Sequence, residues 1–584
     1  MTAGTNTHLP FVQVGIPFFL SLMLLISPVV MAGSKKDLPK PNVLLMEARA
    51  LESAIQDSDE RLSTLERIAR EQIRIDPDAA RSTLKSFPKI PHSSHHLVSL
   101  ASLYAQAGNI AEAEHMYAEI RLGDRSPQGI QASAEAYGQV AVAYANAGKI
   151  EEAFQTLSQL RALYREQSPT IQRDATAQIV RAQAKQGDVQ GALRTAATIA
   201  KDNPIPLMTV IGERIRDGNT TEALEIVSGF EQWLQDYANW GIVLALRDQG
   251  YLRAAQVTAS AMQPGHAKAN ALLALAIQHT KQGSQSTASI LLQEARTAAD
   301  SIGSDETKAD LLWHIAAAMA EAGDADGARE IANAIGRNEQ QFPALRDIVN
   351  AQAAQGDIPG AFNTAFVLNR GNEPVTSDLT PYAFAIADIL TSLVKTRSAK
   401  EALNAVRRFG HLKPQHYLFY SRIATAQAER GDIKGAFSSL SLIETKAQRA
   451  ARKKQLIELT QQLNETQDPD VLAQLTARQA VDHEIGQAYE AITVAQARKG
   501  LQGKATKTAT TLVERPHQNS VFERMGSAQV EAGRARQALT WARSLSSPSN
   551  KAYALVGIAK SLAEQKDSKR LKKYLREYPS TRER

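Results

Sequence analysis

Apolar residues recur along most of this chain at the spacing of one face of an α-helix, in runs that a glycine separates. One run, at positions i, i+3, i+4 and i+7, consists of Leu312, Ile315, Ala316 and Met319. After Gly323, a second run on one helical face consists of Ala328, Ala332 and Ile335. The pattern predicts two amphipathic helices joined by a short turn, and the small residues of the second helix favour close packing.

This helix pair is repeated along the chain. Three stretches are near copies of one another: AQAKQGDVQGAL at 182–193, AQAAQGDIPGAF at 351–362 and AQAERGDIKGAF at 426–437. Alignment on the turn glycine gives units at Gly108, Gly148, Gly187, Gly218, Gly250, Gly283, Gly323, Gly356, Gly431, Gly500 and Gly533. Turns without glycine are expected at or near Asp76, Arg397, Asp468 and Lys566. We therefore expect about fifteen units, which stack because one helix pair cannot bury both of its apolar faces.

Each turn carries a stop signal and a start signal side by side. Glycine adopts the left-handed backbone conformation that ends a helix without a steric penalty. The aspartate that often follows, such as Asp324, is expected to accept hydrogen bonds from the first free N–H groups of the next helix.

The units resemble the tetratricopeptide repeat. The clearest unit has a large, large, small and aromatic first helix, a turn glycine, and a small and an aromatic residue on the second helix: Leu97, Leu100, Ala101, Tyr104, Gly108, Ala113 and Tyr117. The next unit repeats the pattern with Tyr137, Val140, Ala141, Tyr144, Gly148 and Ala153. The resemblance covers roughly residues 60–578. It implies an all-α fold, an α-α superhelix in the form of a right-handed solenoid.

Many units depart from the family by placing glutamine where the first helix has an aromatic residue. These residues are Gln183, Gln352, Gln427, Gln496 and Gln529. A buried glutamine needs hydrogen-bond partners. We favour hydrogen bonds between adjacent units at a packing position, with a polar ladder along the binding groove as the alternative.

The array does not account for the whole chain. We divide it into a signal peptide or membrane anchor at 1–32, a linker or N-terminal helix at 33–60, and a solenoid at 61–445. Residues 446–484 have low apolar content and form either a degenerate repeat or a junction between two sub-arrays. Residues 485–584 are further repeats that end in a basic capping helix.

The apolar segment of residues 11–30, FVQVGIPFFLSLMLLISPVV, predicts an extracytoplasmic protein, either periplasmic or secreted. No Lys or Arg precedes the segment, which departs from the usual signal peptide. The alternative is an uncleaved membrane anchor, because about twenty apolar residues span a bilayer.

The amino-acid composition limits the partners and the kinds of site that we expect. The 67 basic and 61 acidic residues are mixed along the chain and aromatic residues make up only 5%, so we expect no nucleic-acid partner. The absence of cysteine excludes disulfides, thiolate metal sites and cysteine nucleophiles. The Gly-Lys pair at Gly503 lacks the rest of a phosphate loop, and His92, His95 and His96 have no carboxylate beside them. We predict no catalytic residue, no cofactor, no metal and no small-molecule substrate.

Tetratricopeptide proteins hold peptides or partner helices along their concave face. Carried over position by position, the resemblance places these partner-binding residues there: Tyr237, Trp240, Leu273, Trp313, Arg346, Asn350 and Phe384. Arg346 and Asn350 match a carboxylate clamp of some members, whereas Asp388 and Leu418 do not. The sequence thus favours a noncatalytic protein-interaction scaffold of the cell envelope that binds a protein or peptide. The alternatives are an accessory factor that binds an envelope polysaccharide and an enzyme framed by the solenoid.

Overall fold

The computed structural model describes residues 38–87, 94–115, 127–163, 168–200, 203–335, 341–368, 380–443, 446–466, 469–512 and 515–577. The chain divides into two units, Met1–Lys40 and Pro41–Arg584. The described residues of the second unit are helical and contain no strand, which confirms the predicted all-α helical repeat architecture.

Helices alternate between two layers in the second unit. The first helices of the pairs are α2 (Ser58–Ile75), α4 (Ser94–Gln106), α6 (Pro127–Asn146), α8 (Ser168–Lys185), α10 (Ile205–Arg216), α12 (Gln232–Asp248), α14 (His266–Lys281), α16 (Asp305–Glu321), α18 (Gln341–Ala354), α20 (Pro381–Thr396), α22 (His416–Glu429), α25 (Pro469–Arg498), α27 (Arg515–Glu531) and α29 (Pro548–Glu577). The second helices are α3 (Pro77–Lys85), α7 (Ile150–Leu163), α9 (Val189–Ile199), α11 (Thr220–Ser228), α13 (Leu252–Ala261), α15 (Gln285–Asp300), α17 (Ala325–Ala334), α19 (Ile358–Val367), α21 (Ala399–Val406), α23 (Ile433–Leu440), α26 (Gln502–Leu512) and α28 (Ala535–Ser544). The remaining elements are α1 (Pro41–Arg49), α24 (Lys446–Thr466), η3 (Glu52–Ala54) and η4 (Arg407–Gln415).

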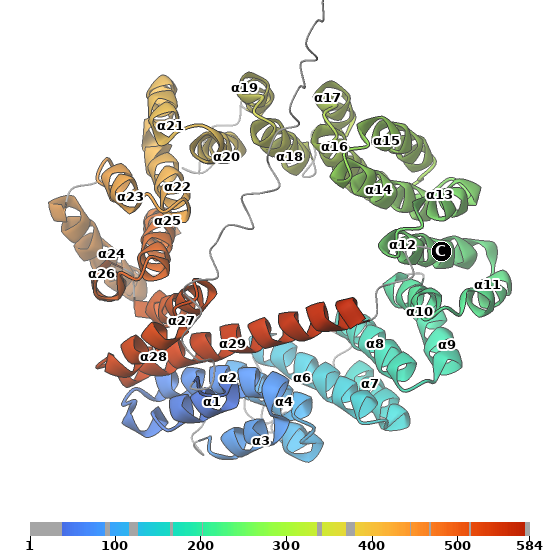
Figure 1. The fold of residues 1–584 in the computed structure, drawn as a ribbon, viewed down its shortest axis with the longest axis horizontal. Helices are drawn as coiled ribbons and strands as arrows, with labels where there is room; N and C mark the ends of the chain where they lie inside the picture. The colour runs from blue at the N-terminus through green and yellow to red at the C-terminus, as the bar shows by residue number, and fades with distance from the viewer. Residues whose placement is uncertain are drawn as a thin grey trace, which may run out of the picture. The chain divides into compact units, whose positions relative to one another are not determined.

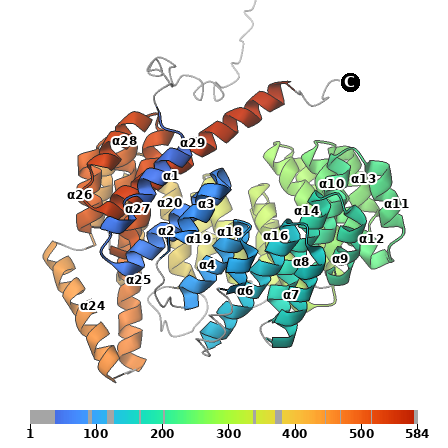
Figure 2. The same cartoon turned by 90° about the horizontal axis from the view of Figure 1, so that it is seen from below.

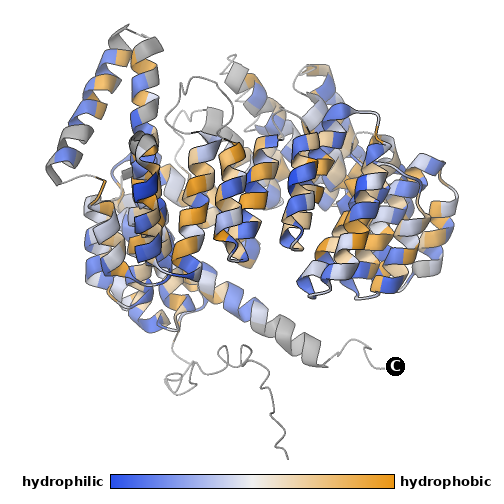
Figure 3. Ribbon diagram, turned by 90° about the horizontal axis from the view of Figure 1, so that it is seen from above, coloured by the Kyte–Doolittle hydropathy of each residue, from blue (hydrophilic) through white to orange (hydrophobic). Residues whose placement is uncertain are grey.

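The first helices form the inner layer of this unit and the second helices lie outside them (Figure 1). Hydrophilic and hydrophobic residues are interspersed along the helices (Figure 3). One continuous cluster of buried apolar residues reaches from Val243 on α12 to Ala426 on α22. The core is therefore shared between units rather than divided among them, as stacking requires.

The turns have the predicted chemistry. The turn glycines have positive φ values between 77° and 95°, as at Gly533 and Gly323. Asp324 accepts a hydrogen bond from the N–H of Gly327 at 2.9 Å, and so caps the start of α17. The expected turn at Asp76 is also formed, because α2 ends at Ile75 and Asp76 caps α3. The turn expected near Lys566 is not formed, since α29 continues to Glu577.

Three of the predicted glutamines, Gln183, Gln352 and Gln427, bond to the capping aspartate of their own unit, whereas Gln529 accepts from Gln502 of the neighbouring unit at 3.2 Å, as expected. Gln427 is buried on α22, and its amide nitrogen donates to the Asp432 carboxylate at 3.1 Å. Its amide oxygen accepts from the Ser439 hydroxyl of α23 at 2.6 Å. Gln352 makes the same two bonds, to Asp357 at 3.3 Å and from Thr364 at 2.7 Å. Gln352 and Gln427 thus each join the two helices of a pair through the capping aspartate of the turn.

A different side chain provides the polar link between units. The residue that precedes the turn glycine reaches back to carbonyl groups at the C-terminal end of the preceding first helix. Gln355 of the α18 unit donates to the carbonyl of Ala320 at 2.8 Å, and Gln186 donates to that of Ala145 at 2.7 Å. Lys499 donates to the carbonyl of Gly431 at 2.6 Å. The carbonyls of Ala320 and Ala145 also accept from the N–H groups of their own turn glycines, Gly323 and Gly148, so the glutamine adds a second bond that connects adjacent units.

Helix α24 and the N-terminal part of α25 lie beside the array rather than within it. The array passes directly from α22 to the C-terminal part of α25, where Arg422 contacts Glu484 at 3.0 Å and Phe437 contacts Tyr489. Helix α24 packs along α25, and the two project away from the neighbouring units (Figure 2). The helical register resumes at Tyr489, on the same helix.

The array closes on itself. Helix α1 packs against α29, and α2 packs against both α1 and α29. Arg67 of α2 donates from Nε to the Glu523 carboxylate of α27 at 2.8 Å. A side chain at Gly557 of α29 would lie only 2.0 Å from the carbonyl oxygen of Glu523, so glycine permits the close crossing of α27 and α29. The N-terminal helices α1 and α2 thus pack on the last helix of the array, where the sequence predicted a basic capping helix. In the basic run of that helix, Lys566 is exposed. The side chains from Lys569 to Arg576 lie outside the described residues.

We predict that Gln427→Ala lowers the free energy of unfolding by about 2 kcal/mol, because it leaves the buried Ser439 hydroxyl without its acceptor. Urea denaturation followed by circular dichroism measures the change. The double variant Gln427→Leu with Ser439→Ala recovers part of the loss, since both partners are then apolar. Gln190→Ala, at an exposed position of α9, is the matched control. Equal effects of Gln427→Ala and Gln190→Ala would contradict the structural role of the glutamine.

Candidate functional site

The residues predicted to bind a partner all lie on first helices, in the inner layer (Figure 1). Tyr237 and Trp240 are on α12, Leu273 is on α14, and Trp313 is on α16. Arg346 and Asn350 are on α18, and Phe384 is on α20. Leu273 is only 6% exposed and belongs to the core, so in this conformation it contributes packing and not a contact surface.

Four of these residues come together in one cleft, which we call the inner cleft. It has a volume of about 410 Å³ and is formed by Trp313, Phe342, Pro343, Arg346, Asp347, Asn350, Pro381 and Phe384. The residues come from the consecutive first helices α16, α18 and α20. Phe342 was not predicted, although it lies one helical turn before Arg346 on the same face. Its side chain is 45% exposed and supplies the most accessible apolar wall.

The guanidinium of Arg346 is held in the inner cleft from two sides. Its Nε donates to Asp388 Oδ2 at 2.7 Å, and the group lies 5.4 Å from the centre of the Phe384 ring. The hydrogen bond to Asp388 raises the pKa of Arg346 above its ordinary value. Asp388, which does not match the carboxylate clamp of tetratricopeptide proteins, fixes the arginine instead.

The indole of Trp313 is fixed in the same way. Its Nε1 donates to Asp347 Oδ2 of the next first helix at 2.7 Å. The ring also stacks on His314, with centroids 4.7 Å apart and planes 18° apart. The two acidic side chains of the cleft thus orient an indole and a guanidinium, which leaves Phe342, Asn350 and the remaining guanidinium N–H groups available to a ligand.

Tyr237 and Trp240 lie apart from the inner cleft, in an aromatic group with His266 of α14. The Trp240 and His266 ring centroids are 5.8 Å apart, and those of Tyr237 and Trp240 are 6.4 Å apart. The rings are partly buried and pack against the core. Trp240 Nε1 and His266 Nδ1 are buried with no hydrogen-bond partner among the described residues. Burial lowers the pKa of His266.

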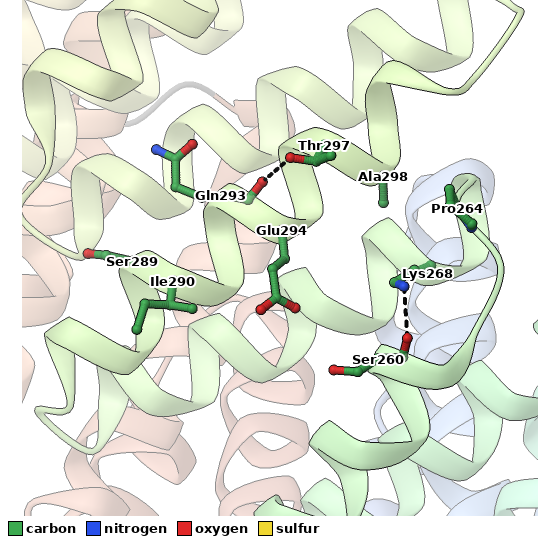
Figure 4. Close-up of a pocket in the computed structure, with 9 residues that line it drawn as sticks. All are labelled: Ser260, Pro264, Lys268, Ser289, Ile290, Gln293, Glu294, Thr297 and Ala298. Atoms are coloured by element: carbon green, nitrogen blue, oxygen red, sulfur yellow. Dashed lines mark hydrogen bonds between the residues drawn. The ribbon is translucent and has the colours of Figure 1, made fainter.

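A larger depression, the outer cleft, lies between the second helices α13 and α15 and has a volume of about 700 Å³ (Figure 4). Ile290, Gln293 and Glu294 of α15 line one side, and Ser260 and Pro264 line the other. The Lys268 amine donates to the carbonyl of Ser260 at 2.9 Å. No aromatic side chain lines the outer cleft, and its lysine is occupied by backbone carbonyls, so it offers a ligand less than the inner cleft does.

The described residues contain no group of three or more His, Asp or Glu side chains that would hold a metal ion. Gly500 forms an ordinary turn with φ of 79°, and the neighbouring Gly503 and Lys504 lie in α26. His92 and the side chains of His95 and His96 lie outside the described residues.

Within the part of the chain that the structure describes, no helix is both long enough and apolar enough to cross a bilayer. The apolar segment 11–30 lies outside that part.

No family model matches this chain, and no curated protein matches it. Among solved structures it is similar to the pentatricopeptide repeat protein PPR10 from maize, at 16% identity over 83% of this chain and 68% of that one, with a TM-score of 0.29. It is also similar to Naa15/Naa10 bound to HypK-THB, at 13% identity over 86% and 82%, with a TM-score of 0.32. A circular tandem repeat protein matches at 14% identity over 90% and 97%, with a TM-score of 0.14. At these scores the likenesses carry no argument about this chain.

We predict that His266 makes the protein less stable in mild acid. Burial lowers its pKa below the ordinary 6.5, although the charge of Asp310 acts in the opposite direction. Below about pH 6.5 the unfolded chain therefore binds more protons than the folded chain, so the free energy of unfolding falls as the pH falls from 7 to 5. Urea denaturation across this range should show a shallower fall in His266→Gln than in the original protein. Parallel pH profiles of the two proteins would refute the assignment.

Proposed function

We propose that this chain is a noncatalytic interaction scaffold of the cell envelope, which binds an extended segment of a partner protein along the inner face of α16, α18 and α20. The observation that carries the proposal is the inner cleft, where Trp313, Phe342 and Phe384 surround a fixed Arg346. Aromatic and arginine side chains supply most of the binding energy at protein interfaces.

The chemistry of the inner cleft suits a peptide. Its aromatic and proline walls accommodate an apolar side chain, and the volume is at the small end of the range of ligand sites. The exposed amide of Asn350 both donates and accepts hydrogen bonds, as a peptide backbone requires. The guanidinium N–H groups of Arg346 add donors for a carbonyl or carboxylate of the partner.

The charges favour a protein over a nucleic acid. Asp347 lines the cleft and Asp388 pairs with Arg346 beside it, so a phosphate backbone would meet two carboxylates and one paired arginine. Asp347 and Asp388 position Trp313 and Arg346 by hydrogen bonds. This positioning role favours a binding site over a catalytic site. The assignment to the envelope is supported by the apolar segment 11–30, read as a secretory signal or as a membrane anchor.

Substitutions in the inner cleft test the proposal. We expect Trp313→Ala, Arg346→Ala and Phe384→Ala each to weaken partner binding about tenfold or more, as truncation of interface anchors does. The measurement is recovery of the partner from solubilised envelope extract on the immobilised full chain, followed by titration of the purified partner. Ile290→Ala, at an exposed position of the outer cleft, is the matched control and should retain full binding.

Three outcomes would overturn the proposed function. Unchanged recovery in all the inner-cleft variants would remove the site. Loss of retention on envelope polysaccharide, with protein recovery unchanged, would favour a glycan ligand. Loss of RNA binding in the same variants would favour a nucleic acid.

A further inference from the structure

The closing joint of the array repeats the arrangement of an internal unit. Inside the array, α17 packs on its own first helix α16 and on the next first helix α18, and α16 packs on α18. At the joint, α1 packs on α29 and on α2, and α2 packs on α29. Helix α1 therefore occupies the place of the second helix of the unit whose first helix is α29. The last unit is split, with its first helix from the C-terminal part of the chain and its second helix from the N-terminal part.

The polar contacts at the joint have an internal counterpart. Arg543 of α28 makes two hydrogen bonds to the Glu47 carboxylate of α1, at 2.8 and 2.7 Å. Inside the array, Arg296 of α15 bonds to Glu330 of α17 at 3.0 Å. Both pairs connect the second helices of neighbouring units and are partly exposed. The internal pair thus offers a matched reference for the joint.

The apolar residues at the joint are buried, as they are inside the array. Leu44, Leu45 and Ala48 on the nine-residue α1 are fully buried. On α29, Leu555 and Ile558 are fully buried as well. Helix α29 also packs on α27 and α2, and Ile558 lies beside Gly526 of α27, so α1 completes the cover of α29.

One property distinguishes the joint from the internal contacts between described units: no loop of the chain connects α29 directly to α1. Neighbouring internal units are consecutive in sequence, whereas Glu47 and Arg543 are separated by 496 residues. Opening the joint therefore breaks only noncovalent contacts. A second copy of the chain offers the same surfaces with the same geometry, which is the condition for exchange of an element between copies.

We propose that the joint exchanges between copies: the face of α29 that α1 covers is an interaction surface, and its partner is α1 of a second copy of this chain. Two opened arrays then pair through two identical joints, each with the Glu47–Arg543 contact. The balance between closed and paired forms depends on protein concentration, because the chain's own α1 competes at the effective concentration that the array imposes.

Cysteine cross-linking of the full chain tests the exchange, since the protein has no cysteine of its own. The Glu47→Cys and Arg543→Cys variants are mixed, incubated at high concentration or refolded together from urea, and treated with a bismaleimide. Neither variant has a second thiol, so neither forms an internal cross-link, and a covalent dimer above the level that collisions give in a reference mixture reports contact between α1 of one copy and α28 of the other. The reference mixture contains Arg296→Cys and Glu330→Cys, whose positions have no chain end to exchange.

We expect a covalent dimer from the joint mixture, none from the reference mixture, and an internal cross-link in a chain that carries both Glu47→Cys and Arg543→Cys. An internal cross-link without a mixed dimer would overturn the proposal, because the joint would then be permanently intramolecular. Equal dimer in both mixtures would also overturn it, since random collision would explain the product. Failure of the double variant to cross-link internally would overturn the closed joint itself.

Discussion

Every helix pair in this array has an apolar face on each side, and its own two helices cannot cover both. This constraint explains the shared core that runs from α12 to α22, in which each pair covers part of the next. It also determines what happens at the ends, where an exposed apolar face is costly. Many repeat arrays meet that cost with polar terminal units. Here α1 and α2 meet it by packing on α29, and Arg67 of α2 pairs with Glu523 of α27 across the joint.

Two sets of polar contacts keep the helices in register, and they act at different levels. Gln352 and Gln427 each bond to the capping aspartate and to a hydroxyl of the second helix, so they fix the angle within their pairs. The side chain before the turn glycine bonds to carbonyls of the preceding first helix, so it fixes one pair against the next. Because both contacts are anchored at the turn, a single short motif specifies both relationships. This accounts for the strict repetition of the motif around Gly187, Gly356 and Gly431.

The local parts of the fold could be predicted from the sequence, because turn glycines, capping aspartates and helical periodicity act over a few residues. The direction of the glutamine bonds could not, since Gln427 stands equally near its own second helix and the next unit until the packing is known. The turn expected near Lys566 was wrong because no glycine stands at that place: the glycine of α29, Gly557, lies nearer its start and permits the close crossing with α27. Closure also escaped prediction: the repeat pattern specifies contacts between neighbours, whereas Glu47 and Arg543 lie at opposite ends of the array.

The inner cleft shows how much of a site follows from such a pattern. Trp313, Arg346, Asn350 and Phe384 were identified by their positions on the first helices, and Phe342 could have been found from its spacing to Arg346. The roles of Asp347 and Asp388 depend on the distance between neighbouring first helices, which only the stacked structure provides. Each acid holds the side chain of the preceding first helix, so the indole and the guanidinium are oriented by the stacking itself. The side chains of Trp313 and Arg346 are therefore largely ordered on folding, so a ligand loses less binding free energy to their conformational entropy. This favours tight binding through a small contact area. The same contacts make the geometry of the cleft sensitive to the angle between α16, α18 and α20, because a change in stacking moves the acids away from their partners.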